Sequence, residues 1–390
     1  MAGLELAFAD EACALAFSDE RFLAAMARFE SALAVASARC GRVPAAHAEA
    51  IAKACEQARF DAAKIGRESR GAGSMAIPFL QALKAQVRAI SAEAAESLHA
   101  GATSQDAIDT ALVLCLREAA RRIDALALRL GRALARLAGD HRETAMAART
   151  LLQPALQISF GYKAAVWLSL VERCLQGFRR ASDEAFVLQF GGPAGTLSSF
   201  DADADELAAQ LAADLSLNAA PIPWHSARDG VARVGAELAI LAGAAGKIGR
   251  DVSLLMQSEV AEASEPSPGG SSSMPHKRNP AGSMLALEAA HRAPGLAATL
   301  LSELSPEHER GLGQWQSQWL TLRELACACA SGLASIAEVV EGLKVDAAAM
   351  RTNLARAHLP ADGSQGADAS AAMIDRVLAR WAATSARAFP

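Results

Sequence analysis

The sequence predicts an all-α protein built on a bundle of long helices. Hydrophobic residues make up 52% of its 390 residues, whereas aromatic residues make up only 5%. Much of the apolar fraction is alanine, which favours helices and lets them pack closely, while strands prefer β-branched and aromatic residues. Two long segments also carry apolar residues at helical spacing, and strand patterns are scarce. A chain of this length buries a large core.

The first 98 residues are predicted to form an N-terminal helical domain. Two breaks, at Gly41–Pro44 and at Gly71–Gly73, divide this region into shorter helices. Proline removes a backbone donor and glycine frees the backbone, so each break ends the helix before it.

Residues 99–345 are predicted to form the central long-helix bundle. In two segments the apolar residues follow steps of three and four, so each lays one apolar stripe along a helix. The period is close to 3.5, as expected for long helices that pack at shallow angles. The first stripe contains Leu112, Leu116, Ala119, Ile123, Leu126, Leu130, Leu134 and Leu137, and the second contains Val234, Leu238, Leu241, Ala245, Ile248, Val252 and Leu255.

Three more helices are expected in this bundle, followed by a shorter segment. One helix follows the pair Gln153-Pro154, one follows Pro280, and one spans about residues 320–340. Residues 346–390 are predicted to form a short, truncated C-terminal helical segment. The Gly- and Ser-containing stretch 360–366 is predicted to be a linker within it.

Charge and composition exclude several functional classes. The formal net charge of −5 argues against a general nucleic-acid binder, so a site for an anionic substrate must concentrate its positive charge locally. The N-terminus lacks the basic stretch followed by an apolar run that marks a secretion signal. No uninterrupted apolar segment is predicted to cross a bilayer. The seven cysteines are odd in number and irregularly spaced, which predicts reduced thiols in the cytoplasm.

No metal or other cofactor is predicted. Cys327 and Cys329 lack the two-residue gap and the second pair that metal sites carry. Glu259, Glu262 and Glu265 also lack the arrangement of a metal site. A solvated or salt-bridged helix face is the simpler interpretation of these three acids.

The stretch Gly270–Pro280 is the strongest functional signal in the chain. Prolines and glycines precede it, so it is predicted to be a loop between helices. Backbone N–H groups, serine hydroxyls and Lys277 together suit an anion whose negative charge grows during a reaction. A flexible connector is the plain alternative, but connectors rarely carry Met274, His276, Lys277, Arg278 and Asn279 in one block.

A second polar segment, His99–Asp106, precedes the first long helix. Thr103 or Ser104 is predicted to cap that helix, because threonine and serine are favoured N-cap residues. The same hydroxyl pair at a positive helix N-terminus also suits a carboxylate. His99 alone is as consistent with a structural role as with a functional one.

These segments resemble a known family. The loop resembles the GSSxMPxKxNP signature of the fumarase/aspartase superfamily, and His99–Asp106 resembles its HxGxTSxD region. The resemblance extends from about Phe17 to about Leu354. It implies a long-helix bundle that forms a homotetramer, with a core of pooled central helices and active sites shared between subunits. The net charge and the lack of an uninterrupted apolar segment already predict neither a nucleic-acid nor a membrane partner.

The resemblance also implies the site residues. Ser271 corresponds to the catalytic base of the family, and Lys277 is the second catalytic residue. A small carboxylate substrate is expected to lie among residues from three separate segments: His99, Thr103, Ser104, Thr150, Gln153, Ser272, Met274, Arg278 and Asn279.

One departure from the family carries chemical meaning. Arg149–Ala155 resembles the second conserved region, in which many lyases read Arg-Thr-His, but this chain has Leu151. A leucine cannot protonate a leaving group, so either activity is lost or the reaction needs no such acid. A carboxylate, with a reference pKa of about 4, leaves as a stable anion, and in reverse it is already a nucleophile. A ring-closing addition of a carboxylate to a double bond therefore fits.

Three further segments resemble one branch of the superfamily. Gln189–Leu197, Pro223–Asp229 and Pro306–Arg310 resemble segments of the 3-carboxy-cis,cis-muconate cycloisomerases, which form a γ-lactone. The resemblance implies an isomerase that converts this tricarboxylate to 4-carboxymuconolactone in the β-ketoadipate pathway. The alternatives are a lyase of the adenylosuccinate or argininosuccinate type, which Leu151 disfavours, and a non-catalytic relative, which the intact loop disfavours.

Overall fold

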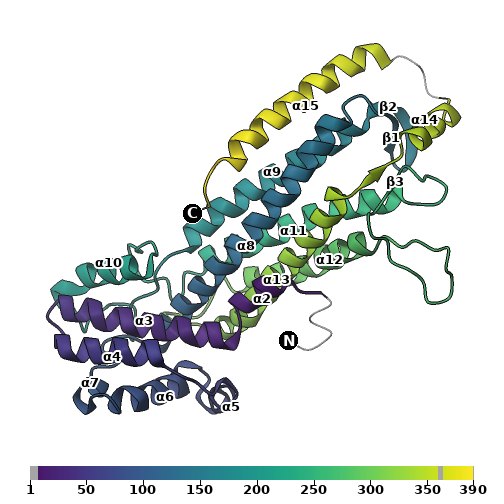
Figure 1. Ribbon diagram of the computed structural model, residues 1–390. Helices are drawn as coiled ribbons and strands as arrows, with labels where there is room; N and C mark the ends of the chain where they lie inside the picture. The colour runs from purple at the N-terminus through teal and green to yellow at the C-terminus, as the bar shows by residue number, and fades with distance from the viewer. Residues whose placement is uncertain (1–7, 359–362, 390) are drawn as a thin grey trace.

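The computed structural model of the chain describes residues 8–358 and 363–389, and it confirms the all-α prediction. Helices dominate, and the strands of the described residues form two small two-stranded sheets. Figure 1 shows one elongated bundle, with a group of shorter helices at one end and the strands at the other.

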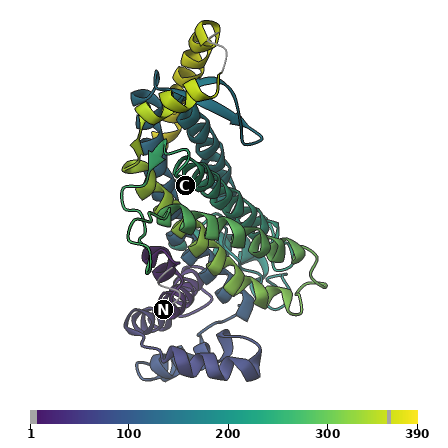
Figure 2. The ribbon, with the colours of Figure 1, turned by 90° about the vertical axis from the view of Figure 1, so that its right-hand side faces the viewer.

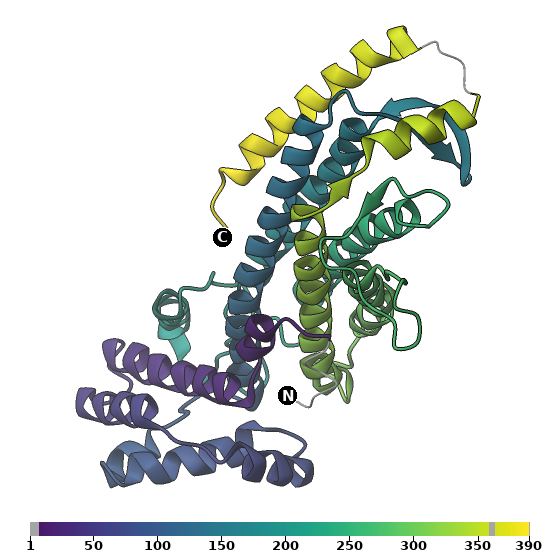
Figure 3. The same cartoon turned by 45° about the vertical axis from the view of Figure 1, so that its right-hand side comes forward.

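Five long helices make the bundle: α8 (Ser104–Asp140), α9 (Phe160–Ala185), α11 (Asp229–Leu255), α12 (Ala281–Ser302) and α13 (Gln314–Glu341). They run side by side along the molecule (Figures 1 and 3). Both predicted stripes are buried, the first in α8 and the second in α11. The helices expected after Pro280 and over residues 320–340 are α12 and α13.

Small residues let α11, α12 and α13 approach one another closely. A Cβ atom added to Gly246 would lie 2.3 Å from the Cβ atom of Ala290, and one added to Gly332 would lie 2.9 Å from that of Ala289. Heavy atoms do not approach so closely, so the bundle requires glycine at these positions.

The shorter helices pack across one end of the bundle, as Figure 2 also shows. The predicted breaks are confirmed, since α3 ends at Arg39 and α5 ends before Gly73, whose φ of 64° is left-handed. The helix α10 (Ala204–Leu215) packs against α3, where Arg39 pairs with Asp214. The helices of this end are α2 (Glu11–Ala16), α3 (Asp19–Arg39), α4 (Ala45–Gln57), α5 (Ala62–Ala72), α6 (Ala76–Arg88) and α7 (Ala92–Glu96).

The helix expected directly after Gln153-Pro154 begins later than predicted. β1 (Ala145–Thr150) and β2 (Gln153–Ser159) form an antiparallel hairpin, and α9 begins only at Phe160. Ser159 caps it by accepting a hydrogen bond from the N–H of Tyr162. Pairing with β1 decides the conformation of β2, and local sequence carries no signal for it. A second small sheet pairs β3 (Ala263–Ser264) with β4 (Lys344–Val345).

The C-terminal residues form α14 (Ala347–Arg356) and α15 (Gly363–Ser385). Residues 360–362 of the predicted linker lie outside the described residues. Gly363–Gly366 belong to α15 and not to a linker, because a helix once nucleated extends through residues of low propensity. α15 lies along α9, where Arg179 donates to the carbonyl oxygen of Thr384 at 3.0 Å.

The helix α13 is long and apolar enough to cross a membrane, by length and composition only. It is not the uninterrupted apolar segment that the sequence analysis looked for, because Arg323, Glu324 and Glu338 interrupt it. In the structure, 61% of the most apolar stretch of α13 is buried, as in a core helix of a bundle.

Two glycines of α11 test the close packing. We expect Gly246→Ala to lower the free energy of unfolding by about 1–3 kcal/mol, because the new methyl group overpacks the contact with Ala290. Gly243→Ala is the matched control, since no atom lies within 4 Å of its added Cβ, and we expect it to stabilise the helix by about 0.5–1 kcal/mol. Urea unfolding followed by circular dichroism measures both. Equal effects of the two changes would contradict the packing argument.

Candidate active site

The predicted catalytic loop is closed at its neck. Gly269 and Asn279 exchange two backbone hydrogen bonds of 2.8 Å. Just outside them, the buried carboxylate of Glu265 accepts from the N–H of Gly282 at 3.0 Å and from the N–H and hydroxyl of Ser283 at 2.9 and 2.7 Å. Glu265 thus fastens the start of the loop to the N-terminus of α12, where negative charge is favoured. Residues 270–278 project beyond this neck (Figure 1).

Ser271 lies in the projecting part of the loop, beside two N–H donors. Its Oγ accepts from the N–H groups of Ser273 and Met274 at 3.4 and 3.2 Å. Donors aimed at an oxygen stabilise negative charge on it. The side-chain amide of Asn279 donates to the Gly270 carbonyl oxygen at 2.8 Å. The remaining predicted loop residues are exposed: Ser272, Met274, Lys277 and Arg278.

Thr150 and Gln153 face each other at the end of the β1–β2 hairpin. Between them, Leu151 and Leu152 have φ values of 51° and 67°, and their side chains are 95% and 70% exposed. A two-residue turn with both φ values positive normally holds Asn-Gly, because branched side chains are strained there. Leu151, which stands where many lyases of the family have a histidine, therefore lies at the tip of the hairpin.

An ion pair joins this hairpin to the loop segment. Arg149 donates two hydrogen bonds, of 2.8 and 2.7 Å, to the two carboxylate oxygens of Glu262. The interpretation of the three acids as a helix face was wrong in part. Glu262 and Glu265 are buried and lie outside the helices, because each carboxylate binds donors from a distant segment, whereas Glu259 is exposed.

Thr103 and Ser104 lie at the opposite end of α8. Thr103 is the N-cap, and its N–H donates to the carboxylate of Asp106 at 3.0 Å. Its hydroxyl accepts from Arg310 at 3.3 Å, and Arg310 also donates to the side-chain oxygen of Gln105 at 3.0 Å. A fixed cation beside a hydroxyl pair suits a carboxylate ligand. The sequence had not placed Arg310 among the site residues, although the segment Pro306–Arg310 was its signal.

Asp106 binds two segments, 189–197 and 223–229, that the sequence analysis had identified separately. It is fully buried and accepts from the N–H groups of Gly191 and Gly192, each at 2.9 Å. Nε2 of His225 lies 2.7 Å from its Oδ1. The segments 189–197 and 223–229 are thereby fixed to the first turn of α8, because a buried carboxylate requires such donors.

Asp109, one turn further along α8, is the second buried carboxylate that binds several donors, and we call it and its partners the Asp109 node. Arg228 donates to its two oxygens at 2.6 and 3.0 Å, and both side chains are almost fully inaccessible to solvent. The indole N–H of Trp315 and the amide of Gln105 also donate to Asp109, each at 3.0 Å. This node holds α8, α11 and α13 together behind Thr103.

His99 connects the start of α8 to α3. Its Nδ1 lies 2.7 Å from Oε1 of the buried Glu30, and its φ of 61° is left-handed. Burial by itself lowers the pKa of His99, but the charge and hydrogen bond of Glu30, together with Asp106, outweigh it and raise the pKa above its ordinary value. These contacts give His99 a structural partner in the chain.

The predicted site residues fall at the two ends of α8. Its 37 residues span about 55 Å at 1.5 Å per residue, with Thr103 before its first turn and the hairpin directly after its last. Within one chain, Thr150 and the loop segment lie at one end, and Thr103, Ser104 and Arg310 lie at the other (Figure 1).

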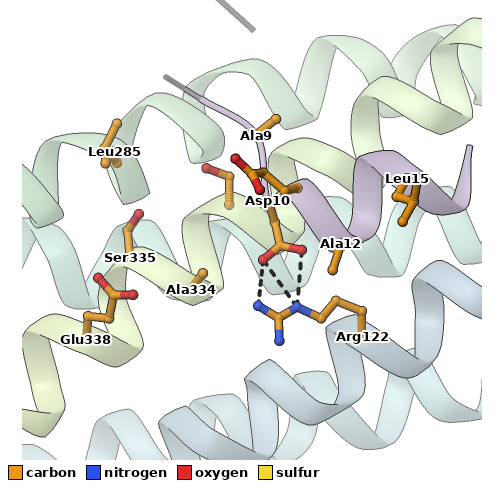
Figure 4. A pocket seen from close by; sticks show the side chains of 11 residues that line it. Ala9, Asp10, Ala12, Leu15, Arg122, Leu285, Ala334, Ser335 and Glu338 are labelled. Carbon is orange, nitrogen blue, oxygen red and sulfur yellow. Dashed lines mark hydrogen bonds and ion pairs between the residues drawn. The ribbon is translucent and has the colours of Figure 1, made fainter. Parts of the chain in front are cut away.

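A cavity of about 600 Å³ lies between α2, α8, α12 and α13. The ion pair of Asp10 and Arg122 lines it, together with Ser335 and Glu338 (Figure 4). None of the predicted site residues lines this cavity. It is therefore separate from both groups described above.

Sequence and structure comparisons identify relatives that cover most of the chain. Residues 10–295 match a family model described as lyase. The chain is 47% identical to a 3-carboxy-cis,cis-muconate cycloisomerase of Bradyrhizobium diazoefficiens, over 88% of this chain and 77% of the relative. It is 41% identical to a nitrosuccinate lyase of Streptomyces davaonensis, over 87% of this chain and 74% of the relative. The crystal structure of the 3-carboxy-cis,cis-muconate lactonizing enzyme from Pseudomonas putida matches with a TM-score of 0.91 at 34% identity, covering 98% of this chain and all of that one.

The buried node at Asp109 generates a stability prediction. We expect Asp109→Ala to lower the free energy of unfolding by about 3–5 kcal/mol, because it leaves Arg228 charged and buried without its carboxylate. Asp229→Ala is the control: it removes an exposed pair with Arg233 and should change stability by less than about 0.5 kcal/mol. Denaturant unfolding of both variants is the measurement. A small effect of Asp109→Ala would show that the node does not hold the helices.

The hairpin tip generates a second prediction. We expect the double change Leu151→Asn with Leu152→Gly to stabilise the folded protein by about 1–3 kcal/mol, because it relieves two left-handed leucines. Thermal unfolding by calorimetry measures this gain. The exposed pair Leu301→Asn with Leu304→Gly serves as a control without left-handed leucines. If the tip variant gained no stability, the turn would not be strained.

Proposed function

The chain belongs to the lyase family matched above, and from this premise we propose that it catalyses the ring closure of 3-carboxy-cis,cis-muconate to 4-carboxymuconolactone. The observation that carries the proposal is Leu151 at the exposed hairpin tip, beside Thr150. An apolar side chain there suits a reaction whose entering or leaving group is an ionised carboxylate, because such a group needs neither acid nor base.

The proposed reaction begins with the substrate itself. One carboxylate oxygen attacks a carbon of the diene and forms the C–O bond of the lactone. The electron pair of the double bond moves to the carbon next to another carboxylate and spreads onto its oxygens, giving an enolate-like dianion. A proton is then added to that carbon, so the product is an isomer of the substrate.

We assign the stabilisation of this charge to the loop. Lys277 supplies a cation, and Asn279 and the loop N–H groups supply hydrogen-bond donors. The hydroxyl of Ser271 donates the proton to carbon, and the N–H groups of Ser273 and Met274 stabilise the resulting alkoxide until solvent restores its proton. The exposed positions of Ser272, Met274 and Arg278 leave them available to contact the substrate.

We further propose that each active site combines residues from more than one copy of the chain in a homotetramer. The length of α8 supports this, because a helix about 55 Å long lies between Thr103 and the hairpin that carries Thr150. In an antiparallel pair of copies, one end of the bundle lies against the opposite end of its partner. Arg310 would then bind a substrate carboxylate beside Thr103 and Ser104 of the same copy.

We propose that the protein is cytoplasmic. Its seven cysteines are odd in number and irregularly spaced, a pattern typical of reduced thiols in a reducing compartment. The substrate is proposed to be a free small tricarboxylate, which an acidic protein recognises through local cations such as Lys277 and Arg310.

A second candidate is supported by the relative named nitrosuccinate lyase. Elimination from nitrosuccinate would break a C–N bond and release nitrite. Nitrite is also a stable anion that leaves without a proton, so Leu151 is compatible with it. By contrast, adenylosuccinate and argininosuccinate release nitrogen groups that benefit from an acid.

A substrate screen tests the proposal. The purified protein is incubated with carboxymuconate, nitrosuccinate, adenylosuccinate or argininosuccinate, and ultraviolet absorbance follows loss of the diene or formation of fumarate. We expect turnover of carboxymuconate, and Ser271→Ala should lower its kcat by about 10²–10⁴-fold because the proton donor is lost. Ser267→Ala, on the exposed part of the same segment before the neck, is the matched control and should leave kcat unchanged.

Two outcomes would contradict the proposal. Turnover of another substrate in place of carboxymuconate would reassign the reaction. Near-normal kcat in a folded Ser271→Ala protein would remove Ser271 from its role.

A further inference from the structure

Glu262, which precedes the loop, contacts several segments that are distant in the sequence. Its carboxylate is fully buried, with no exposed side-chain area. It accepts two hydrogen bonds from Arg149 of β1 and one of 2.9 Å from the amide of Asn353 in α14. Its backbone N–H donates to Leu255 at the end of α11, and its carbonyl oxygen accepts from the N–H of Asp346. One residue therefore joins the hairpin, the end of α11 and the C-terminal segment.

The outer hairpin needs such a side-chain anchor. The strand register shifts between Ala147 and Arg149, where β2 carries one more residue than β1. A bulge of this kind interrupts the ladder and bends the strand. Beyond it only two residue pairs remain, Arg149 with Pro154 and Thr150 with Gln153, and Pro154 has no N–H to donate. The backbone ladder alone therefore holds the end of the hairpin weakly.

The ion pair supplies the missing constraint. Two parallel N–H···O bonds between a guanidinium and a carboxylate fix both distance and orientation. Side chains alternate between the two faces of a strand, so Arg149 and its neighbour Thr150 point to opposite faces of β1. Fixing Arg149 from one side therefore sets the direction in which Thr150 points on the other.

The same carboxylate is anchored close to the loop. Glu262 directly precedes β3 and lies three residues before Glu265, which fastens the loop neck to α12. The Arg149–Glu262 pair thus connects the hairpin to the segment that carries Ser271 and Lys277. A shift of either element would have to break two hydrogen bonds to a buried charge.

We infer that Glu262 is a positioning residue, which acts through Arg149 to hold Thr150 in the orientation that substrate binding requires. This inference rests on the proposed function of the site. Glu262 does not touch the substrate, and its part is to fix the hairpin end relative to the loop segment.

The test compares Glu262→Gln with Asp124→Asn. Asp124 pairs with Arg179 through two hydrogen bonds, of 2.5 and 3.0 Å, and is buried mid-bundle away from the predicted site residues. Both variants remove the charge of a buried, bidentate carboxylate. We expect kcat/KM for carboxymuconate to fall about 10²-fold in Glu262→Gln, because a misplacement of about 1 Å has that effect. Asp124→Asn should keep the kcat/KM of the unaltered protein.

A double-mutant cycle with Thr150→Ala separates positioning from general structural damage. If Glu262 acts through Thr150, Glu262→Gln should change kcat/KM by less than about threefold once the Thr150 hydroxyl is absent. An equal loss in both backgrounds would overturn the inference. Arg149→Lys, which keeps the charge but not the paired geometry, should reproduce the loss if Glu262→Gln does not fold.

Hydrogen exchange decides the inference independently of activity. Amides of residues 149–153 should exchange faster in Glu262→Gln, or in Arg149→Lys, and should be unchanged in Asp124→Asn. Unchanged exchange at the hairpin end would overturn the positioning role. If the unaltered protein does not turn over carboxymuconate, the proposed function fails, and the exchange result still shows whether Glu262 holds the hairpin.

Discussion

The rigid length of α8 is the constraint on which the rest of the structure depends. A helix of 37 residues keeps its two ends about 55 Å apart, and the polar segments of the chain gather at those ends. Hydroxyls, Arg310 and the His99–Glu30 pair lie before its first turn, and the hairpin follows its last turn. The segment that leads into the loop 270–278 is joined to the hairpin end by the Arg149–Glu262 pair. This separation is the basis for the proposal that active sites combine residues of different copies of the chain.

Buried carboxylates organise the irregular backbone at both ends. Asp106 and Asp109 bind the segments 189–197 and 223–229 to α8, while Glu262 and Glu265 bind the hairpin and the loop neck. Such charges are costly to bury alone, and each is accordingly matched by several N–H donors or by a guanidinium. Loops without regular hydrogen-bond ladders thereby acquire defined positions. Residues 272–278 are exposed and contrast with this firm neck, which agrees with the proposed role of the loop in binding a substrate.

The chemistry follows from what the two ends present. The protein has a formal net charge of −5, yet Lys277 and Arg278 lie exposed on the loop and Arg310 lies beside Thr103. Local cations and N–H groups stabilise a growing negative charge more effectively than net charge does. Under the proposed function, Leu151 stands where a proton donor would serve other leaving groups, and the proposed reaction uses groups that depart or enter as stable anions.

The sequence by itself determined the all-α bundle, its two buried stripes and the loop around Ser271 and Lys277, because helical spacing and loop composition are local signals. It also narrowed the cap of α8 to Thr103 or Ser104, and the structure shows that Thr103 is the cap. It did not determine the hairpin, since β2 acquires its conformation by pairing with β1. Nor did it determine the roles of Asp106, Asp109, Glu262 and Arg310, whose charges become site-forming only through partners up to about two hundred residues away. Tertiary structure decided these, because burial and long-range hydrogen bonding leave no local pattern.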